Sequence, residues 1–326
     1  MTKNIKQIFY CLLLILYLTS FSTFGANIHR ITDYHQTFFP CYNKEGDLRI
    51  AIRMYYFDST PYLLVVNPST FITETAPATE FKPRKIIGDV PGYFTMRELR
   101  ETPYIKALVK YTLPPYVLQN YGITHAEKPV DGLFLTVDLC PSIKTFETNL
   151  FNTLVTMAEN QHHSMSVALS VSGLWIIGHP EEFNWLIQQV KDNKLKIIWI
   201  NHSFSHVYYA DLPLEQNFLL EPHTNTTHEI LATEKLLLEH GQLPSVFFRF
   251  PGLVSNEKLI LKLNKYGLIP VGADAWLAKG EEPKTGSFIL VHGNSNEPQG
   301  IKILMPILKD LNNHWLPLDE AFVKGN

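Results

Sequence analysis

From about residue 130 onward, short apolar runs alternate with longer segments whose apolar residues recur with a helical period. Seven runs typical of β-strands lie at residues 132–138, 166–170, 195–200, 246–250, 269–274, 288–292 and 315–318. Between them, segments 146–157 and 183–190 place their large apolar side chains on one face of a predicted helix. Apolar strands that alternate with helices predict a parallel sheet covered by helices, either an open doubly wound sheet or a closed barrel.

The first third of the chain has a different pattern. Residues 47–57 and 62–66 are short runs rich in β-branched and aromatic residues, as in strands, and the apolar positions of 96–111 have a helical period. We find no chemical motif in this part. We therefore predict an accessory region of mixed α+β structure over 26–125, either a small domain or an extension packed on the main domain, which we place at 126–326.

The first residues have the pattern of an export signal. Lys3 and Lys6 form a basic start, and the apolar run that follows them at 8–18 is too short to span a bilayer of about 30 Å. Small residues then suit cleavage before Ala26. We predict a signal peptide over 1–25 and a mature protein in the periplasm or outside the cell, with no membrane attachment after cleavage. An uncleaved anchor is the alternative.

Charge and cysteine content narrow the classes of partner. The formal net charge is −3 and no basic block is present, which argues against nucleic acid as a partner. Of the three cysteines, Cys11 lies in the predicted signal peptide, so Cys41 and Cys140 remain. In an oxidising compartment these two can form one disulfide, or they can be two separately buried thiols.

Titratable residues follow or end several predicted strands. They are Asp138, His202, His206, Arg249, Asp274 and His292. In parallel α/β folds the chemistry takes place at the carboxyl ends of the strands, where such residues meet at one edge of the sheet. This convergence predicts an enzyme.

The residue types at this edge suggest specific roles. His202 and His206 are four residues apart, so on one helical turn both rings would point to the same side and could share a metal ion; the alternative is a pair of hydrogen-bonded histidines. Asp138 ends an apolar strand and needs a counter-charge, for which we expect Arg249. His292 is either an acid–base group or a buried structural histidine.

Five segments in this order resemble the polysaccharide deacetylase family, also called the NodB homology domain or carbohydrate esterase family 4. The segments are Thr136-Val-Asp-Leu-Cys-Pro141, His202-Ser-Phe-Ser-His206, Arg249-Phe-Pro-Gly252, Asp274-Ala-Trp276 and Leu290-Val-His292. The resemblance covers about residues 130–320. It implies an α/β fold, a distorted (β/α) barrel of about seven strands, here preceded by the mixed α+β extension.

The resemblance also implies a reaction and a cofactor. The family hydrolyses the acetamide of N-acetylated polysaccharides, here peptidoglycan, a chitin-like polymer or poly-N-acetylglucosamine, with a divalent metal that is usually zinc. His202 and His206 match the family's metal ligands, and Asp138 matches its general base.

The remaining matches suggest supporting roles. Arg249 would hold Asp138 in place and keep it ionised. His292 would protonate the leaving amine, with Asp274 and Trp276 setting its charge and orientation. A hydrolase of the same fold that acts on a non-sugar amide or ester is a further alternative.

One position departs from the family pattern. The family's third metal ligand is the second aspartate of its first motif, and Leu139 stands there in this chain. Leucine cannot bind a metal, and two histidines alone make a weak site. We expect Asp138 to converge with the two histidines and to contact the metal itself. Alternatively, the protein has lost the metal and only binds glycans.

Overall fold

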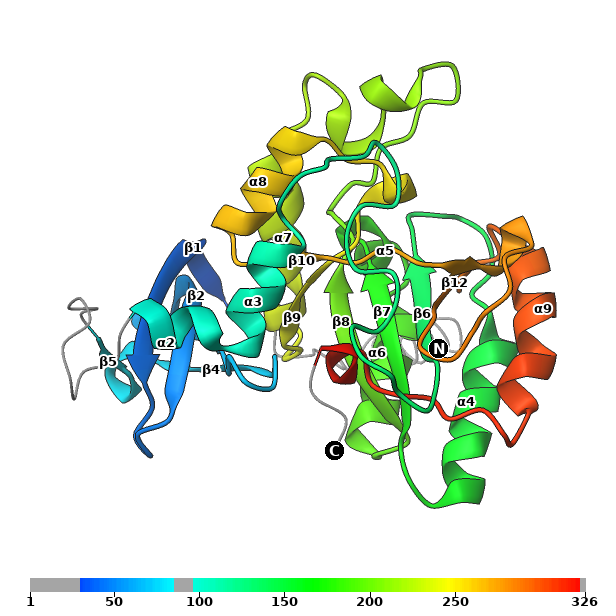
Figure 1. Cartoon of the computed structure of the whole chain (residues 1–326), viewed down its shortest axis with the longest axis horizontal. Coiled ribbons are helices and arrows are strands. Elements are labelled where there is room, and N and C mark those ends of the chain that lie inside the picture. Colours follow the sequence, from blue (N-terminus) through cyan, green and yellow to red (C-terminus); the bar gives the residue numbers. More distant parts are fainter. Residues whose placement is uncertain (1–29, 85–95, 323–326) are drawn as a thin grey trace, which may run out of the picture.

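The computed structural model describes residues 30–84 and 96–322, and two β-sheets organise this part of the chain (Figure 1). The signal peptide predicted for residues 1–25, with its cleavage site before Ala26, lies outside the described residues. Among the described helices, none is both long and apolar enough to cross a membrane.

The first sheet is formed by the N-terminal region. Its five strands, in the order β4-β3-β2-β1-β5, are β1 (Ile31–Tyr42), β2 (Leu48–Phe57), β3 (Thr60–Val66), β4 (Thr73–Pro77) and β5 (Lys82–Pro83). All pairings are antiparallel. Asp58 and Ser59 join β2 to β3 with positive φ angles of 44° and 68°, which suits a tight hairpin turn. The predicted strands at 47–57 and 62–66 correspond to β2 and β3.

Short helices follow this sheet. The helix predicted at 96–111 is divided into α2 (Met96–Glu101) and α3 (Pro103–Lys110), and a 3-10 turn, η1 (Ala78–Glu80), precedes them. The division occurs at Thr102 because Pro103 has no backbone N–H and favours the first position of a new helix.

The second sheet contains seven strands, all paired in parallel, in the order β10-β9-β8-β7-β6-β12-β11. The strands are β6 (Phe134–Leu139), β7 (Met165–Val171), β8 (Leu195–Asn201), β9 (Pro244–Phe248), β10 (Ile269–Pro270), β11 (Ala275–Trp276) and β12 (Phe288–His292). The helices that cover it are α4 (Thr148–Gln161), α5 (Gly173–Gly178), α6 (Pro180–Lys191), α7 (Thr226–Glu239), α8 (Glu257–Lys265) and α9 (Pro298–Lys309).

This sheet curls into an incomplete barrel. β10 and β11 lie on opposite edges, yet only residues 271–274 separate them in the chain. An extended chain of that length spans at most about 18 Å, so the two edges must approach each other. The expected distorted (β/α) barrel is therefore confirmed. The single strand predicted at 269–274 is instead two short strands that belong to different edges.

The strand predicted at 315–318 was wrong. Trp315 forms only an isolated bridge with Leu133, and a 3-10 turn, η6 (Leu318–Ala321), follows it. Pro317 has no N–H to donate to a neighbouring strand, which explains why pairing stops there.

The strands of the barrel have two buried faces. In β6, Leu135, Val137 and Leu139 pack in the core that lies under the helices, together with Phe151 of α4 and Leu304 of α9. The intervening side chains point the other way, toward the barrel interior, because side chains alternate along a strand. Leu139 is completely buried in this outer core.

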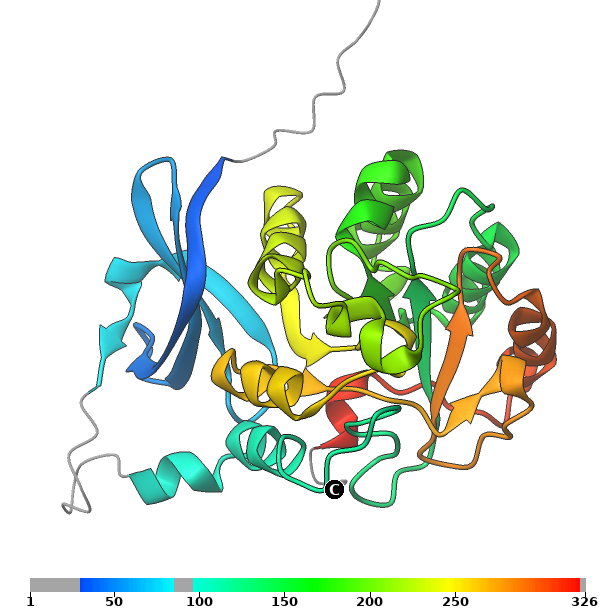
Figure 2. The ribbon, with the colours of Figure 1, turned by 90° about the horizontal axis from the view of Figure 1, so that it is seen from above.

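The N-terminal sheet packs directly on the barrel. One hydrophobic core joins Ile52 and Leu64 of the first sheet with Val246 and Ile269 of the second. In Figure 2 the first sheet lies beside α7 and α8. The predicted boundary between 125 and 126 remains a prediction, although this shared core favours a packed extension.

A buried ion pair crosses the same interface. Arg53 of β2 donates to Glu234 of α7 through Nε at 2.6 Å and Nη2 at 2.8 Å, and its Nη1 donates to the carbonyl of Tyr266 at 2.6 Å. The two charged side chains are 0% and 1% exposed. Glu234 also accepts from Asn201, the residue before His202, at 3.4 Å. The first sheet is thus connected to the end of β8.

Candidate functional site

A cavity of about 290 Å³ opens at the carboxyl ends of the barrel strands. The residues in its wall include Asp138, Cys140, His202, His206, Trp276, His292 and Glu297. They come from the ends of β6, β11 and β12 and from the segments that follow β6, β8 and β12. Of the residues predicted for the site, Arg249 and Asp274 are absent from this wall.

Asp138 and Arg249 form the buried ion pair expected from the sequence. Nη1 of Arg249 donates to Oδ1 of Asp138 at 2.7 Å and to Oγ1 of Thr136 at 2.7 Å, and Nη2 donates to the carbonyl of Gly272 at 2.8 Å. Burial alone would raise the pKa of Asp138, but the charges of Arg249, His202 and His292 and the hydrogen bond from Arg249 together outweigh it and lower this pKa to about 2. Asp138 is therefore held ionised and in one orientation.

His202 is fixed in one tautomer. Its Nδ1 lies 2.8 Å from the carbonyl oxygen of Arg249, and because a carbonyl can only accept, Nδ1 must carry the proton. Nε2 is then free to donate its lone pair, and it lies 3.6 Å from Sγ of Cys140. A backbone partner on one nitrogen that leaves the other free is the usual arrangement of a metal-binding histidine.

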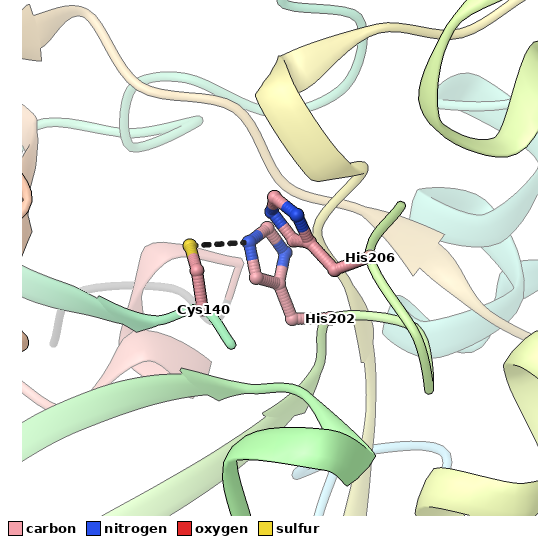
Figure 3. A group of neighbouring side chains, drawn as sticks. All are labelled: Cys140, His202 and His206. Atoms are coloured by element: carbon pink, nitrogen blue, oxygen red, sulfur yellow. Dashed lines mark hydrogen bonds between the residues drawn. The ribbon is translucent and has the colours of Figure 1, made fainter. Parts of the chain in front are cut away.

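His206 reaches the same place from a loop, not from the helical turn that its spacing suggested. Ser203 and His206 have positive φ angles of 66° and 48°, so residues 202–206 do not form a helix. The two imidazole rings nevertheless lie 4.7 Å apart (Figure 3). Nε2 of His206 is buried and has no hydrogen-bond partner among the described residues. A cation would satisfy this orphaned acceptor.

A buried carboxylate holds this loop in shape. Oε2 of Glu229 accepts from the backbone N–H groups of Phe204 and Ser205 at 3.0 and 2.9 Å, and Oε1 accepts from Oγ of Ser205 at 2.7 Å. Thr233, one turn further along α7, donates to the carbonyl of Ser203 at 2.7 Å. The positions of the two histidines thus depend on α7.

The cluster that could hold a metal contains Cys140, which the sequence analysis did not assign. The ligand atoms of Cys140, His202 and His206 all lie within 4.8 Å of one another (Figure 3). Ligand atoms on a tetrahedral zinc lie roughly 3.3–3.7 Å apart, so the 3.6 Å between Sγ of Cys140 and Nε2 of His202 fits such a site. Burial would raise the pKa of Cys140, but the charge of His206 and the proximity of His202 and His292 hold it well below its usual value.

The expectation that Asp138 supplies the third ligand stays a prediction, and Cys140 is a second candidate for this position. Oδ2 of Asp138 lies 3.8 Å from Nε2 of His202, but Oδ1 is committed to Arg249, and Asp138 is not part of the three-residue cluster. Strand geometry explains why Cys140 reaches the cavity and Leu139 does not. Leu139 points into the outer core, whereas Cys140 lies on the same side as Asp138. Strict alternation along the predicted strand was the sequence signal that could have identified Cys140. Cys41 and Cys140 are both buried, free thiols.

His292 faces Glu297, which the sequence analysis also missed. Nδ1 of His292 lies 2.9 Å from Oε2 of Glu297, and the same oxygen accepts from Nε1 of Trp276 at 2.7 Å. Burial lowers the pKa of His292, but the neighbouring thiol of Cys140 and the carboxylates of Glu297 and Asp138 together outweigh this effect and raise it to about 11. His292 is therefore protonated at neutral pH.

Asp274 does not contact His292, and its predicted role was wrong. Its carboxylate accepts from the backbone N–H of Phe288 at 2.9 Å and pairs with Nδ1 of His125 at 2.8 Å. Phe288 begins β12 and His292 ends it, so the two positions are about 13 Å apart along the strand. Asp274 lies at the wrong end of β12 because the chain crosses from one sheet edge to the other at 271–274.

The contribution of Glu229 can be measured through metal affinity. Glu229→Ala should lower the affinity of the three-residue cluster for a divalent metal by about 10–100-fold, the usual cost of losing a group that orients metal ligands. Competition with a chromogenic chelator measures this affinity. Glu221→Ala is the control. Glu221 also lies between β8 and the first turn of α7, but it accepts hydrogen bonds from His223 and Thr224 and not from residues 202–206. Equal affinities of the two variants would show that the loop keeps its shape without Glu229.

Comparisons with known proteins give two findings. Residues 32–105 match the family described as RP012 protein N-terminal domain. The chain is also similar to several solved structures. One is a family 4 carbohydrate esterase from Bacillus anthracis, with 18% identity over 67% of this chain and 90% of that one and a TM-score of 0.44.

Two further solved structures are of the same kind. The family 4 carbohydrate esterase PdaA from Bacillus subtilis has 15% identity over 66% of this chain and 87% of that one, with a TM-score of 0.46. A family 4 pseudoenzyme from Bacillus anthracis has 12% identity over 67% and 81%, with a TM-score of 0.42.

Proposed function

We propose that this protein is an exported, metal-dependent hydrolase that removes N-acetyl groups from a polysaccharide of the cell wall or the extracellular space. The observation that carries this proposal is the geometry of one cavity. A three-donor cluster of Cys140, His202 and His206 lies between an ionised carboxylate, Asp138, and a protonated histidine, His292. Amide hydrolysis needs these three components: an electrophilic centre, a proton acceptor and a proton donor.

The donor set favours zinc. One thiolate and two imidazoles are ligands that zinc accepts in tetrahedral sites, whereas magnesium and calcium prefer oxygen. The orphaned Nε2 of His206 and the fixed tautomer of His202 both fit a cation at this point. Three protein ligands leave a fourth position open, as in catalytic zinc sites. When bound, the ion polarises the acetamide carbonyl and lowers the pKa of water.

The residues of the chain then divide the proton transfers. Asp138, kept ionised by Arg249, accepts the proton of the attacking water. Arg249 also fixes the direction of the carboxylate, because its guanidinium is held by Thr136 and by the carbonyl of Gly272. His292 donates its proton to the amine nitrogen as the carbon–nitrogen bond breaks. The products are acetate and a free amino sugar.

The rest of the cavity suits a sugar substrate. Tyr208 and Phe218 stack with ring centroids 5.2 Å apart on one wall, and Trp276 and Leu290 are also part of the lining. Aromatic and aliphatic faces of this kind cover the apolar sides of a sugar ring or of an acetyl methyl group.

A direct test measures acetate release. The substrates are a pentamer of N-acetylglucosamine, peptidoglycan fragments and p-nitrophenyl acetate, each with and without 1,10-phenanthroline. We expect release from at least one glycan, loss of this release with the chelator and recovery on addition of zinc. His292→Ala should reduce turnover by about 10²–10⁴-fold while the variant still binds zinc. His125→Ala is the control, since this histidine pairs with Asp274 outside the cavity.

A glycan-binding protein without activity is the alternative, and Leu139 at the position of the family's aspartate favours it. This alternative predicts glycan binding that the chelator does not change and no acetate from any substrate. Release from p-nitrophenyl acetate alone would instead indicate a hydrolase of simple esters.

A further inference from the structure

Glu297 occupies a position that none of the five motifs contains. It is the residue before the first turn of α9, and its side chain extends back over the end of β12. Oε2 of this carboxylate lies 2.9 Å from Nδ1 of His292 and accepts from Nε1 of Trp276 at 2.7 Å. A single oxygen therefore connects the indole of β11 to the imidazole of β12.

We propose that Glu297 is the positioning residue of His292, in place of the aspartate of the fourth motif. This inference rests on the proposed function. The carboxylate lies at ion-pair distance from Nδ1 and holds the ring from that side by charge, while the rest of the ring lines the cavity. The indole N–H of Trp276 fixes the carboxylate in turn. Trp276 thus keeps the orienting role expected for it, but acts through Glu297.

The segment that carries Glu297 is anchored on both sides of the cavity. Nδ2 of Asn294 donates to the carbonyl of Cys140 at 2.7 Å, and Oγ of Ser295 lies 2.8 Å from the carbonyl oxygen of Thr145 and 2.7 Å from Oε1 of Glu147, one of which accepts its single proton. These bonds connect residues 293–297 to the end of β6 and to the beginning of α4. The same segment therefore sets the distance between the thiol of Cys140 and the carboxylate of Glu297.

Gly293 permits this close approach. A Cβ atom at this position would lie 2.7 Å from Cγ1 of Val137 and 2.9 Å from Cδ2 of Leu139, which is closer than real Cβ atoms come. Both neighbours are buried, so neither can move away without disturbing the outer core. The chain can turn from His292 toward Glu297 at this point because glycine has no side chain.

Steady-state kinetics on the N-acetylglucosamine pentamer tests the proposal. Glu297→Gln should lower kcat by about 10²-fold, the scale on which misplacing a reacting group costs rate, with KM changed less than about two-fold. Its zinc affinity should equal that of the wild type. Asp274→Asn, the matched control, should keep the wild-type kcat. A Glu297→Gln variant with wild-type kcat, or a larger loss in Asp274→Asn, would overturn the proposal.

A second measurement does not depend on turnover. In zinc-loaded protein labelled with ¹⁵N-histidine, the side-chain spectrum of the wild type should show His292 with a proton on Nδ1. Glu297→Gln should shift these signals, and Asp274→Asn should leave them unchanged. Signals unchanged in Glu297→Gln would contradict the positioning role. If the wild type releases no acetate but its His292 signals shift in Glu297→Gln, the proposed function is contradicted and Glu297 is still the partner of His292.

Discussion

Arg53→Met is expected to lower the free energy of unfolding by about 3–5 kcal/mol, which is the usual cost of breaking a fully buried ion pair from one side. The substitution leaves the carboxylate of Glu234 without its guanidinium in the interface between the two sheets, where the side chain is 1% exposed. It also removes a donor from the carbonyl of Tyr266. Urea denaturation followed by circular dichroism measures the change.

Two further variants identify the cause. Lys44→Met removes an exposed ion pair with Glu80 on the same sheet, so we expect a change of less than about 1 kcal/mol. The double variant Arg53→Met/Glu234→Leu no longer has an unpaired charge and should recover part of the stability. If Arg53→Met were as stable as Lys44→Met, the pair would not hold the two sheets together.

Cys140→Ala is expected to lower the affinity for zinc by more than about 100-fold, because loss of a ligand should exceed the 10–100-fold cost of losing an outer partner. Cobalt provides a direct readout, since a thiolate bound to cobalt(II) gives a charge-transfer band in the near ultraviolet. This band should be present in the wild type and absent in the variant. Acetate release should be lost with the metal.

Cys41→Ala is the matched control for this experiment. Cys41 is the other buried, free thiol, and it lies in the core of the first sheet with Ala51 and Leu63. This variant should keep both the cobalt band and the zinc affinity. A Cys140→Ala variant that binds zinc like the wild type would return the third ligand to Asp138.

The alternation of apolar strands and helices predicted the architecture because a parallel sheet buries both of its faces. The pattern could not show where a strand stops pairing. Residues 269–274 are as apolar as a strand, yet β10 ends at Pro270 and the chain leaves one sheet edge for the other. That crossing is decided by the closure of the barrel, which depends on all seven strands together.

The site was predicted as far as its residues belong to the motifs. Asp138 and Arg249 pair as expected, and His202 and His206 meet, although a loop and not a helix brings them together. The residues that hold the histidine loop in shape were not found, because contacts such as that between Glu229 and Phe204 join separate elements of the fold.

Cys140 and Glu297 were missed for different reasons. Cys140 could have been identified by extending the strand alternation one residue past Leu139. Glu297 could not, because Pro298 marks the first turn of α9 but nothing in the sequence indicates that the side chain of Glu297 turns back to His292.

The ion pair between the two sheets also has a consequence for synthesis on the ribosome. Arg53 and Glu234 are 181 residues apart in the chain. At about 5–20 residues per second, the ribosome needs about 10–40 s to make the partner of Arg53 after Arg53 itself. During this interval the nascent first sheet has an uncompensated guanidinium and an uncovered apolar face around Ile52 and Leu64. During this interval the N-terminal region is therefore open to aggregation, which a chaperone would limit.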